Sequence, residues 1–333
     1  MQILFRNKNL TILTIAVLVW AAWLALLGIE PAFNYVAENW QITITMIFGS
    51  MIAGGTSIGG GAVAFPIFTK LLHIAPYDAK VFSLAIQSVG MGAATLAIIL
   101  TRIKVEWRVI LWGSFGGFLG VWFGLDALAS LLPPPAIKMS FTMMLTSFAI
   151  MLFILNRTGL PHRHETMPVW SWHEKTVIFF AGLLGGIMSG LVGNGIDIFV
   201  FATMVLLFRM CEKVSTPTSV ILMTFNAMAG FALQVFVIND FTPPAMHYWY
   251  AAIPVVVVGA PLGAMFCSKL SRETIANMLI ALIFIEFISS LILIQFNALV
   301  IYSSLSIFAL FSILNYWMYR TRTYEKLPLA INS

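Results

Sequence analysis

Hydrophobic residues occupy most of the chain, and polar residues are confined to short intervals between long apolar runs. Eight of these runs approach or exceed the roughly 20 residues that an α-helix needs to cross a bilayer. They lie at 10–28, 82–101, 109–125, 139–156, 214–238, 245–268, 274–295 and 298–319. Two further apolar stretches, 40–69 and 176–207, are too long and too rich in glycine for a simple crossing. The pattern predicts an all-α polytopic membrane protein with about eight full transmembrane helices.

The two glycine-rich stretches echo each other. Residues 54–66 read GGTSIGGGAVAFP, and residues 190–202 read GLVGNGIDIFVFA. A shift of 136 positions places Gly59 on Gly195. Internal repeats around broken hydrophobic segments are typical of transporters that evolved by duplication. We therefore predict an internal structural repeat.

Positive charges indicate how the glycine-rich stretches lie in the membrane. If both crossed once, with the N-terminus inside, Arg102, Lys104 and Arg108 would fall outside. If each instead enters and leaves on one side, only three lysines remain outside, namely Lys70, Lys80 and Lys138. The positive-inside rule favours the second arrangement, with two re-entrant helical hairpins and both termini cytoplasmic.

The hairpin arrangement divides the chain into two repeats of opposite orientation. The first repeat comprises a helix in 1–30, retained rather than cleaved as a signal peptide, and 40–126, with its hairpin at 40–69. The second repeat is 139–268, with its hairpin at 176–207. Two last helices in 274–319 and a cytoplasmic tail, 320–333, follow. Three full crossings in each repeat, an odd number, predict an inverted repeat.

The hairpin tips are the predicted substrate site. Arms of about 12 residues reach roughly 18 Å, just past the midplane of the bilayer core. Irregular backbone at that depth must line a cavity or be buried in protein, and the helix that leaves each tip presents N–H groups that favour an anion. The tip residues expected at the site are Ser57, Gly59, Gly60, Gly61, Gly193, Asn194 and Gly195. Close helix packing is the alternative for glycines, and it suits Gly113, Gly116, Gly117, Gly120, Gly259 and Gly263 better.

The helix after each hairpin carries polar residues toward the same place. Ser83 and Gln87 share a helix face, since they are four residues apart. The 136-residue shift places Ser83 on Ser219, and Asn226 lies one to two turns further along that second helix. Their hydroxyl and amide groups could supply hydrogen bonds to an oxyanion, although ordinary interhelical hydrogen bonding explains them as well.

Two carboxylates lie deep in apolar segments. Asp197 directly follows the second tip, and Glu286 lies near the centre of the run at 274–295. Ionisable groups at such depth are costly, and they therefore suggest a function. We predict that Asp197 or Glu286 couples transport to an ion gradient. The alternative roles are a hydrogen bond to the tip backbone for Asp197 and a structural or ion-pair role for Glu286.

Other residue types point to no further chemistry. Cys211 and Cys267 are too few and too far apart for a disulfide framework or a metal cage. The histidines at 162, 164 and 173 lie in one hydrophilic loop without a matching ligand cluster, so we expect no metal and no cofactor. The net charge of +5 is spread over loops and the tail and reflects membrane topology, not nucleic-acid binding.

The two glycine motifs, with the later STPTSV, resemble the TauE/SafE family, the sulfite exporter family of membrane permeases. The resemblance covers roughly 45–270. It implies transport of sulfite or of a small organosulfur anion such as sulfoacetate, across the cytoplasmic membrane of a bacterium.

Three classes of function compete. A secondary transporter accounts for the repeat, the paired tips and the lack of a nucleotide-binding motif. An anion channel could share the architecture. A membrane-embedded enzyme would need a catalytic set that the sequence lacks, so we expect no enzyme. The anion (including thiosulfate), the transport direction and the coupling ion, a proton or sodium, stay open, as does the oligomeric state, with a homodimer as one candidate.

Overall fold

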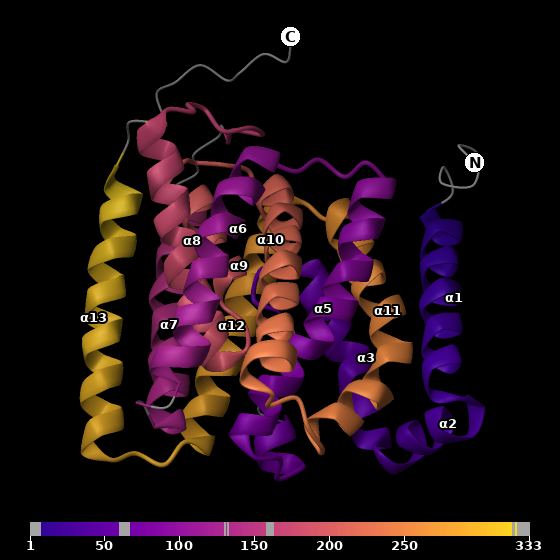
Figure 1. The fold of residues 1–333 in the computed structure, drawn as a ribbon. Helices are drawn as coiled ribbons and strands as arrows, with labels where there is room; N and C mark the ends of the chain where they lie inside the picture. The colour runs from indigo at the N-terminus through magenta and orange to yellow at the C-terminus, as the bar shows by residue number, and fades with distance from the viewer. Residues whose placement is uncertain are drawn as a thin grey trace.

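The structure, a computed structural model, describes residues 8–59, 67–129, 131, 133–157, 163–321 and 324. Its regular elements are helices, apart from one isolated bridge between His164 and Met210 (Figure 1). In chain order they are α1 (Lys8–Leu27), α2 (Ile29–Glu38), α3 (Trp40–Gly55), η2 (Ile67–Leu71), α5 (Pro76–Leu100), α6 (Trp107–Phe123), η3 (Gly124–Leu128), α7 (Pro134–Arg157), α8 (Trp172–Val192), α9 (Ile196–Ala202), η4 (Thr203–Leu207), α10 (Glu212–Leu233), η5 (Gln234–Ile238), α11 (Ala245–Lys269), α12 (Arg272–Leu293) and α13 (Ala298–Arg320). The elements named η are single π-helical turns.

Within the described residues, nine helices are long and apolar enough to cross a membrane. Eight of them occupy the predicted crossings, and the multi-pass all-α class is confirmed. The ninth is α8, which the sequence assigns to an arm of the second hairpin. Its 21 residues exceed the expected arm of about 12 residues. The helix is longer because the Ser171–Glu174 capping box starts it before the apolar run.

The ends of the helices gather on two opposite faces of the bundle (Figure 1). Face A contains the connections at 72–75 and 239–244 and the end of η3, and Tyr77 donates there to Asp240 Oδ2 over 2.7 Å. Face B contains the connections at 101–106, 163–171, 208–211 and 270–271. The helix α2, which the sequence pattern does not single out, lies on face A (Figure 1).

The second hairpin enters and leaves on face B. The Tyr324 hydroxyl donates to Glu174 Oε1, at the start of α8, over 2.6 Å. The Tyr324 carbonyl accepts from His164 Nε2 over 2.8 Å. The His164 backbone N–H in turn donates to the carbonyl of Arg209, just past the end of η4, over 2.9 Å. The two arms of this hairpin therefore begin and end beside the same residues.

The first hairpin enters and leaves on face A. At its start, Thr43 Oγ1 donates to the carbonyl of Ala251, near the beginning of α11. At its end, the Phe68 ring packs on Phe82 with centroids 5.2 Å apart, and Phe82 packs on Tyr248. Tyr248 and Ala251 are neighbours on α11, so both ends lie at the face A end of that helix. The two hairpins thus open on opposite faces.

The return arms of the two hairpins end in the same backbone conformation, 136 positions apart. The π-turn η2 (Ile67–Leu71) corresponds residue by residue to η4 (Thr203–Leu207). Each turn is followed by a residue with positive φ, His73 at 53° and Arg209 at 55°. The backbone hydrogen bonds also correspond, because the amides at 72 and 74 bond the carbonyls at 67 and 68, and the amides at 208 and 210 bond those at 203 and 204.

Glycines bring the outer arm of each hairpin against the last helix of the other repeat. A Cβ on Gly54 of α3 would lie 1.9 Å from the Ala260 carbonyl oxygen of α11. At positions 136 away from these, a Cβ on Gly190 of α8 would lie 2.9 Å from the Gly124 carbonyl carbon, at the end of α6. The predicted packing role of the glycines in α6 and α11 is confirmed, because a Cβ on Gly116, Gly120 or Gly263 would lie near 2 Å from a backbone oxygen. Such reciprocal contacts are what a two-fold inverted repeat requires; the repeat itself stays a prediction.

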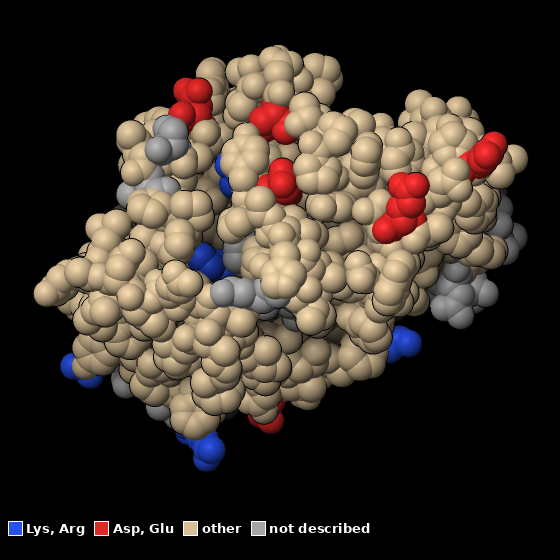
Figure 2. Space-filling view, turned by 90° about the horizontal axis from the view of Figure 1, so that it is seen from below, with Lys and Arg blue, Asp and Glu red and all other residues tan. Residues whose placement is uncertain are grey.

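Charge is distributed unequally between the faces. Face B and the helix turns next to it carry most of the basic residues, namely Arg102, Lys104, Arg108, Arg157, Arg163, Lys175, Arg209, Lys213, Lys269, Arg272 and Arg320. Face A carries Glu30, Glu38, Asp78, Asp126 and Asp240. Figure 2, which views face A, shows acidic side chains scattered over this face, and basic ones recessed in a hollow as well as at the outer edge.

Candidate functional site

The two hairpin tips contact each other inside the bundle, as the sequence predicts. The Asn194 side chain, at the second tip, donates from Nδ2 to the Ile58 carbonyl of the first tip over 2.9 Å. A Cβ on the adjacent Gly59 would lie 3.1 Å from Asn194 Nδ2, so a side chain there would crowd the contact. Gly60 and Gly61, also predicted at this site, lie outside the described residues.

Each tip is also held by a serine of the helix that follows the other hairpin. Ser83 Oγ of α5 donates to the Gly193 carbonyl of the second tip over 3.1 Å. Ser219 Oγ of α10 donates to Ser57 Oγ of the first tip over 2.8 Å. Both partners in the second contact are 136 positions from those in the first. The two contacts are thus related by the same 136-residue offset as the two glycine motifs.

Gln87 reinforces the second tip. Its Nε2 donates to the Gly193 carbonyl over 2.8 Å and to Ser83 Oγ over 2.7 Å. Its Oε1 is buried and has no hydrogen-bond partner among the described residues. In this conformation the Ser83 and Gln87 donors bind the tip backbone. They are free to bind a solute only if the tip moves.

Glycine is required at two positions of the second tip. Gly193, the C-cap of α8, has φ +94°, and Gly195 has φ +150°. L-residues rarely adopt these conformations, whereas glycine, which has no Cβ, does so readily. A Cβ on Gly193 would also lie 2.7 Å from Ser83 Cβ, and a Cβ on Gly195 would lie 2.8 Å from Met188 Cβ. The chain at this tip is thus closely packed on both sides.

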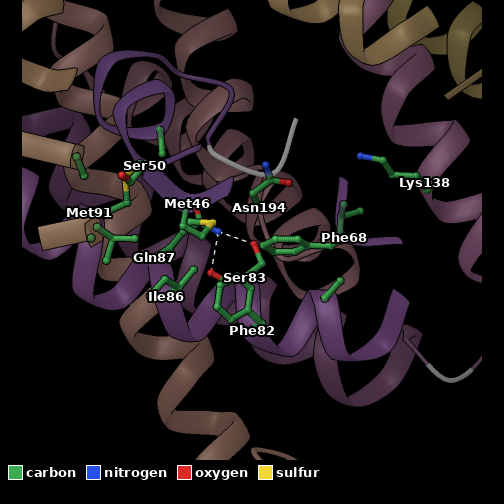
Figure 3. A pocket seen from close by; sticks show the side chains of 16 residues that line it. Met46, Ser50, Phe68, Phe82, Ser83, Ile86, Gln87, Met91, Lys138 and Asn194 are labelled. Atoms are coloured by element: carbon green, nitrogen blue, oxygen red, sulfur yellow. Dashed lines mark hydrogen bonds between the residues drawn. The ribbon is translucent and has the colours of Figure 1, made fainter. Parts of the chain in front are cut away.

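A cavity of about 30 Å³ lies beside the tips. Three of the predicted site residues line it, Ser83, Gln87 and Asn194 (Figure 3). Apolar residues form most of the remaining wall, among them Met46, Phe68, Phe82, Ile86, Met91 and Val256. Ser57, Gly59, Gly193, Gly195, Ser219 and Asn226 do not line it; the first five shape or hold the tips.

Sequence reasoning missed two polar residues of this cavity, Ser50 on α3 and Lys138 on α7. Figure 3 shows the Lys138 side chain extending toward the space beside Asn194. Lys138 lies one residue before the apolar run that begins at 139, so the charge pattern places it in a loop. The structure places it in the second turn of α7 and buries it. The sequence feature that could have indicated a buried Lys138 is a lysine immediately before a long apolar run.

Asp197 is buried at the junction of the tips. Its Oδ1 accepts from the Ile198 backbone N–H over 3.0 Å, whereas Oδ2 has no hydrogen-bond partner among the described residues. A Cβ on Gly59 would lie 3.3 Å from Oδ2, so this oxygen faces the first tip. The Ile196 N–H donates to Ser189 Oγ over 3.1 Å. Side chains of the protein therefore already bind amides at the start of α9 that were expected to face an anion.

Glu286 lies away from the tips and forms an ion pair. Its Oε1 is 2.5 Å from Lys138 Nζ, and both side chains are buried. The Thr142 hydroxyl donates to the same oxygen over 3.3 Å. The sequence offered coupling and ion pairing for Glu286, and the structure shows the ion pair. Its connection with the cavity runs through Lys138.

Asn226 is buried between α6 and the second tip rather than in the cavity. A Cβ on Gly117 would lie 3.1 Å from Asn226 Oδ1 and 2.2 Å from Ile196 Cδ1. Both amide atoms of Asn226 lack a hydrogen-bond partner among the described residues. Such unpaired groups are costly to bury in a closed structure. Behind the tip, Asn226 thus offers an amide donor and an amide acceptor that no described residue binds in this conformation.

Comparison with known proteins agrees with this architecture. The family model described as sulfite exporter TauE/SafE matches residues 42–290, about three quarters of the chain, including both hairpins and the cavity. This chain belongs to the TauE/SafE family. No curated protein and no solved structure matches it. This TauE/SafE protein is therefore a multi-pass membrane protein of a transporter family, not of an enzyme family.

Proposed function

We propose that this protein is a secondary transporter that exports sulfite, or a small organosulfonate such as sulfoacetate, by alternating access around the two hairpin tips. The observation that carries the proposal is the direct contact between the tips, Asn194 to Ile58, from hairpins that open on opposite faces. A solute bound beside this contact reaches either face when one hairpin moves against the other.

The reciprocal serine contacts support this mechanism. Ser83 and Gln87 hold the second tip, and Ser219 holds the first, each through hydrogen bonds of an ordinary length. Breaking one set releases donors that can bind an oxyanion, so the solute replaces the bonds that the moving tip gives up. Polar groups buried in the membrane then keep partners throughout the cycle.

The size of the cavity favours the smaller candidate. A volume of about 30 Å³ has room for roughly two or three water molecules. Sulfite, with one sulfur and three oxygens, is close to that size, and sulfoacetate adds a carboxymethyl group. Sulfite therefore requires less rearrangement of Phe68, Phe82 and Met91 than an organosulfonate does.

Asp197 is the candidate coupling residue. Its unpartnered Oδ2 faces Gly59 across the tip junction, where a proton or a sodium ion would bind both tips at once. A buried carboxylate with one oxygen unpartnered among the described residues favours such a binding event. Binding of the cation and formation of the contact between the tips then depend on each other, which couples transport to the cation gradient.

The charge distribution supports a location in the cytoplasmic membrane. The positive-inside rule favours an orientation with face B, which carries many basic residues, on the cytoplasmic side. The C-terminal end of α13 and the N-terminal end of α1 then lie on the cytoplasmic side. The partners under this proposal are the lipid bilayer, the anion and the coupling ion.

The test is sulfite flux in proteoliposomes that contain the purified protein. Asn194→Leu removes the contact between the tips, and Asn315→Leu is a matched control, because Asn315 is equally buried but donates to Ser147 Oγ elsewhere in the bundle. We expect saturable sulfite flux from the wild type and from Asn315→Leu, and its loss in Asn194→Leu. Equal flux in both variants would contradict the tip mechanism, and a non-saturating current in the wild type would indicate a channel.

A further inference from the structure

Lys138 lies where two cavities meet. It lines the central cavity beside the tips, and it also lines a second cavity of about 70 Å³ at face A, which we call the vestibule. The vestibule is lined by Pro76, Tyr77, Lys80, Ala129, Pro134, Ile137, Lys138, Leu191 and Val192. Of the residues that the structure describes, Lys138 and Val192 line both cavities. Lys138 therefore occupies the neck between the vestibule and the hairpin tips.

The basic side chains described on face A are concentrated along this route. Among the described side chains, the lysines of this face are Lys80 and Lys138, and both line the vestibule. Lys80 lies over the Tyr77 ring at 4.9 Å, near the Asp240 carboxylate that binds the Tyr77 hydroxyl. Lys138 is the deeper of the two, because it alone extends to the tips.

The ion pair of Lys138 is an expensive one for a membrane interior. Lys138 Nζ and Glu286 Oε1 are 2.5 Å apart, with the side chains 7% and 0% exposed. Apolar residues of similar volume commonly replace a buried ion pair with no loss of stability. Glu286 Oε2 has no hydrogen-bond partner among the described residues, so the pair is also incompletely satisfied. A pair of this kind suggests a function beyond stability.

We propose that Lys138 is a substrate-binding residue at the neck, and that Glu286 is its counter-ion when no solute is bound. A small oxyanion arriving from either cavity binds the Lys138 ammonium in place of Glu286. Competition between the anion and Glu286 for one cation limits the affinity and allows release on the other side. This inference deepens the proposed function and rests on it. It assigns to Lys138 the positive charge for anion binding that the tip residues lack.

The test compares anion binding in variants that keep the charge balance. Lys138→Met with Glu286→Leu removes the pair together, and Arg163→Met with Glu212→Leu is the matched control, because that buried pair lies near face B. Thermal stabilisation of the purified full-length protein is titrated with sulfite, sulfate, thiosulfate and sulfoacetate. We expect the control to bind the anion like the wild type. The Lys138 double variant should need at least about tenfold more anion for the same thermal stabilisation, because it loses a charge-assisted hydrogen bond.

Glu286→Gln provides a second, independent readout. This nearly isosteric change removes the charge that competes with the anion while Lys138 stays in place. We expect tighter anion binding than in the wild type, which a purely structural ion pair would not produce. Weaker or unchanged binding in Glu286→Gln overturns the proposal, as does wild-type affinity in the Lys138 double variant.

The outcomes separate this inference from the proposed function. A wild type that is stabilised only by an anion other than sulfite or an organosulfonate, with that effect lost in the Lys138 double variant, overturns the proposed substrate and supports Lys138. A wild type that none of the four anions stabilises overturns both. Sulfite binding that survives removal of the ion pair overturns Lys138 alone.

Discussion

Replacing Gly193 with alanine tests whether the second tip is held as tightly as the structure indicates. Gly193 has φ +94°, and an alanine Cβ would lie 2.7 Å from Ser83 Cβ. The left-handed conformation costs an alanine roughly 1–2 kcal/mol. Overpacking against Ser83 adds about 1–3 kcal/mol. The expected loss in the free energy of unfolding is therefore roughly 2–5 kcal/mol.

Two other glycines separate these contributions. Gly28 has φ +81° and ψ 162°, another conformation that is nearly restricted to glycine, and an added Cβ would meet only Pro31 Cδ at 3.7 Å, so Gly28→Ala should show a conformational cost without overpacking. Gly92 lies inside α5, and its Cβ would meet only the flexible end of Met228 at 3.4 Å. Gly92→Ala should stabilise the protein by about 0.5–1 kcal/mol, because alanine favours the helix.

The assay is unfolding of the purified variants in detergent, followed by the sulfite titration on those that fold. The expected order of stability is Gly92→Ala, wild type, Gly28→Ala, Gly193→Ala. We also expect Gly193→Ala to lose sulfite binding, because a displaced tip loses its bonds to Ser83 and Gln87. If Gly193→Ala were no less stable than Gly28→Ala, the tight contact between position 193 and Ser83 would not exist in solution. The arrangement of the second tip described above would then be wrong.

Three further results are expected. Asp197→Asn should abolish sulfite flux driven by a pH gradient but keep exchange, measured in proteoliposomes, since the amide preserves the shape and cannot take a proton; gradient-driven flux at the wild-type rate would place coupling elsewhere. Single cysteines that replace Arg102 and Arg157 should resist an impermeant thiol reagent applied to the outside of cells, because both positions lie at face B, the proposed cytoplasmic face. Labelling of either cysteine would contradict the proposed topology. The hydrogen bond and charge of Lys104 lower the pKa of Glu165, so this pair should stabilise the protein above about pH 4.5 and lose that effect as the pH falls through the lowered pKa; a Lys104→Met variant whose stability has the same acid dependence as the wild type would refute the pairing.

The arrangement of the crossings could be predicted from sequence for simple physical reasons. A helix in lipid needs about 20 apolar residues, so the lengths of the runs define the eight crossings. Closely spaced glycines end helices, so the tips appear in the sequence at Gly59 and Gly195. The start of α8 was predicted less well, since the capping box of Ser171 and Glu174 lengthens a helix without changing its apolar pattern.

The candidate site could be predicted only in part. Ser83, Gln87 and Asn194 were expected beside the tips, and they line the cavity. What their donors bind was not predictable, because a hydrogen-bond donor binds whichever acceptor packing brings close. In the closed structure that acceptor is the Gly193 carbonyl. Asn226 illustrates the same limit, since helix packing places it behind the tip.

By itself, the sequence determined the membrane class, the two similar glycine-rich tips and the asymmetry of charge, because each follows from local composition and a fixed offset along the chain. Only the tertiary structure decided which side chains and backbone groups from distant parts of the chain contact each other. Lys138 and Glu286 belong to different helices and form one ion pair, and Ile58 and Asn194 join two hairpins. Such contacts depend on how helices distant in sequence pack, and close packing allows a single arrangement of partners that no local pattern records.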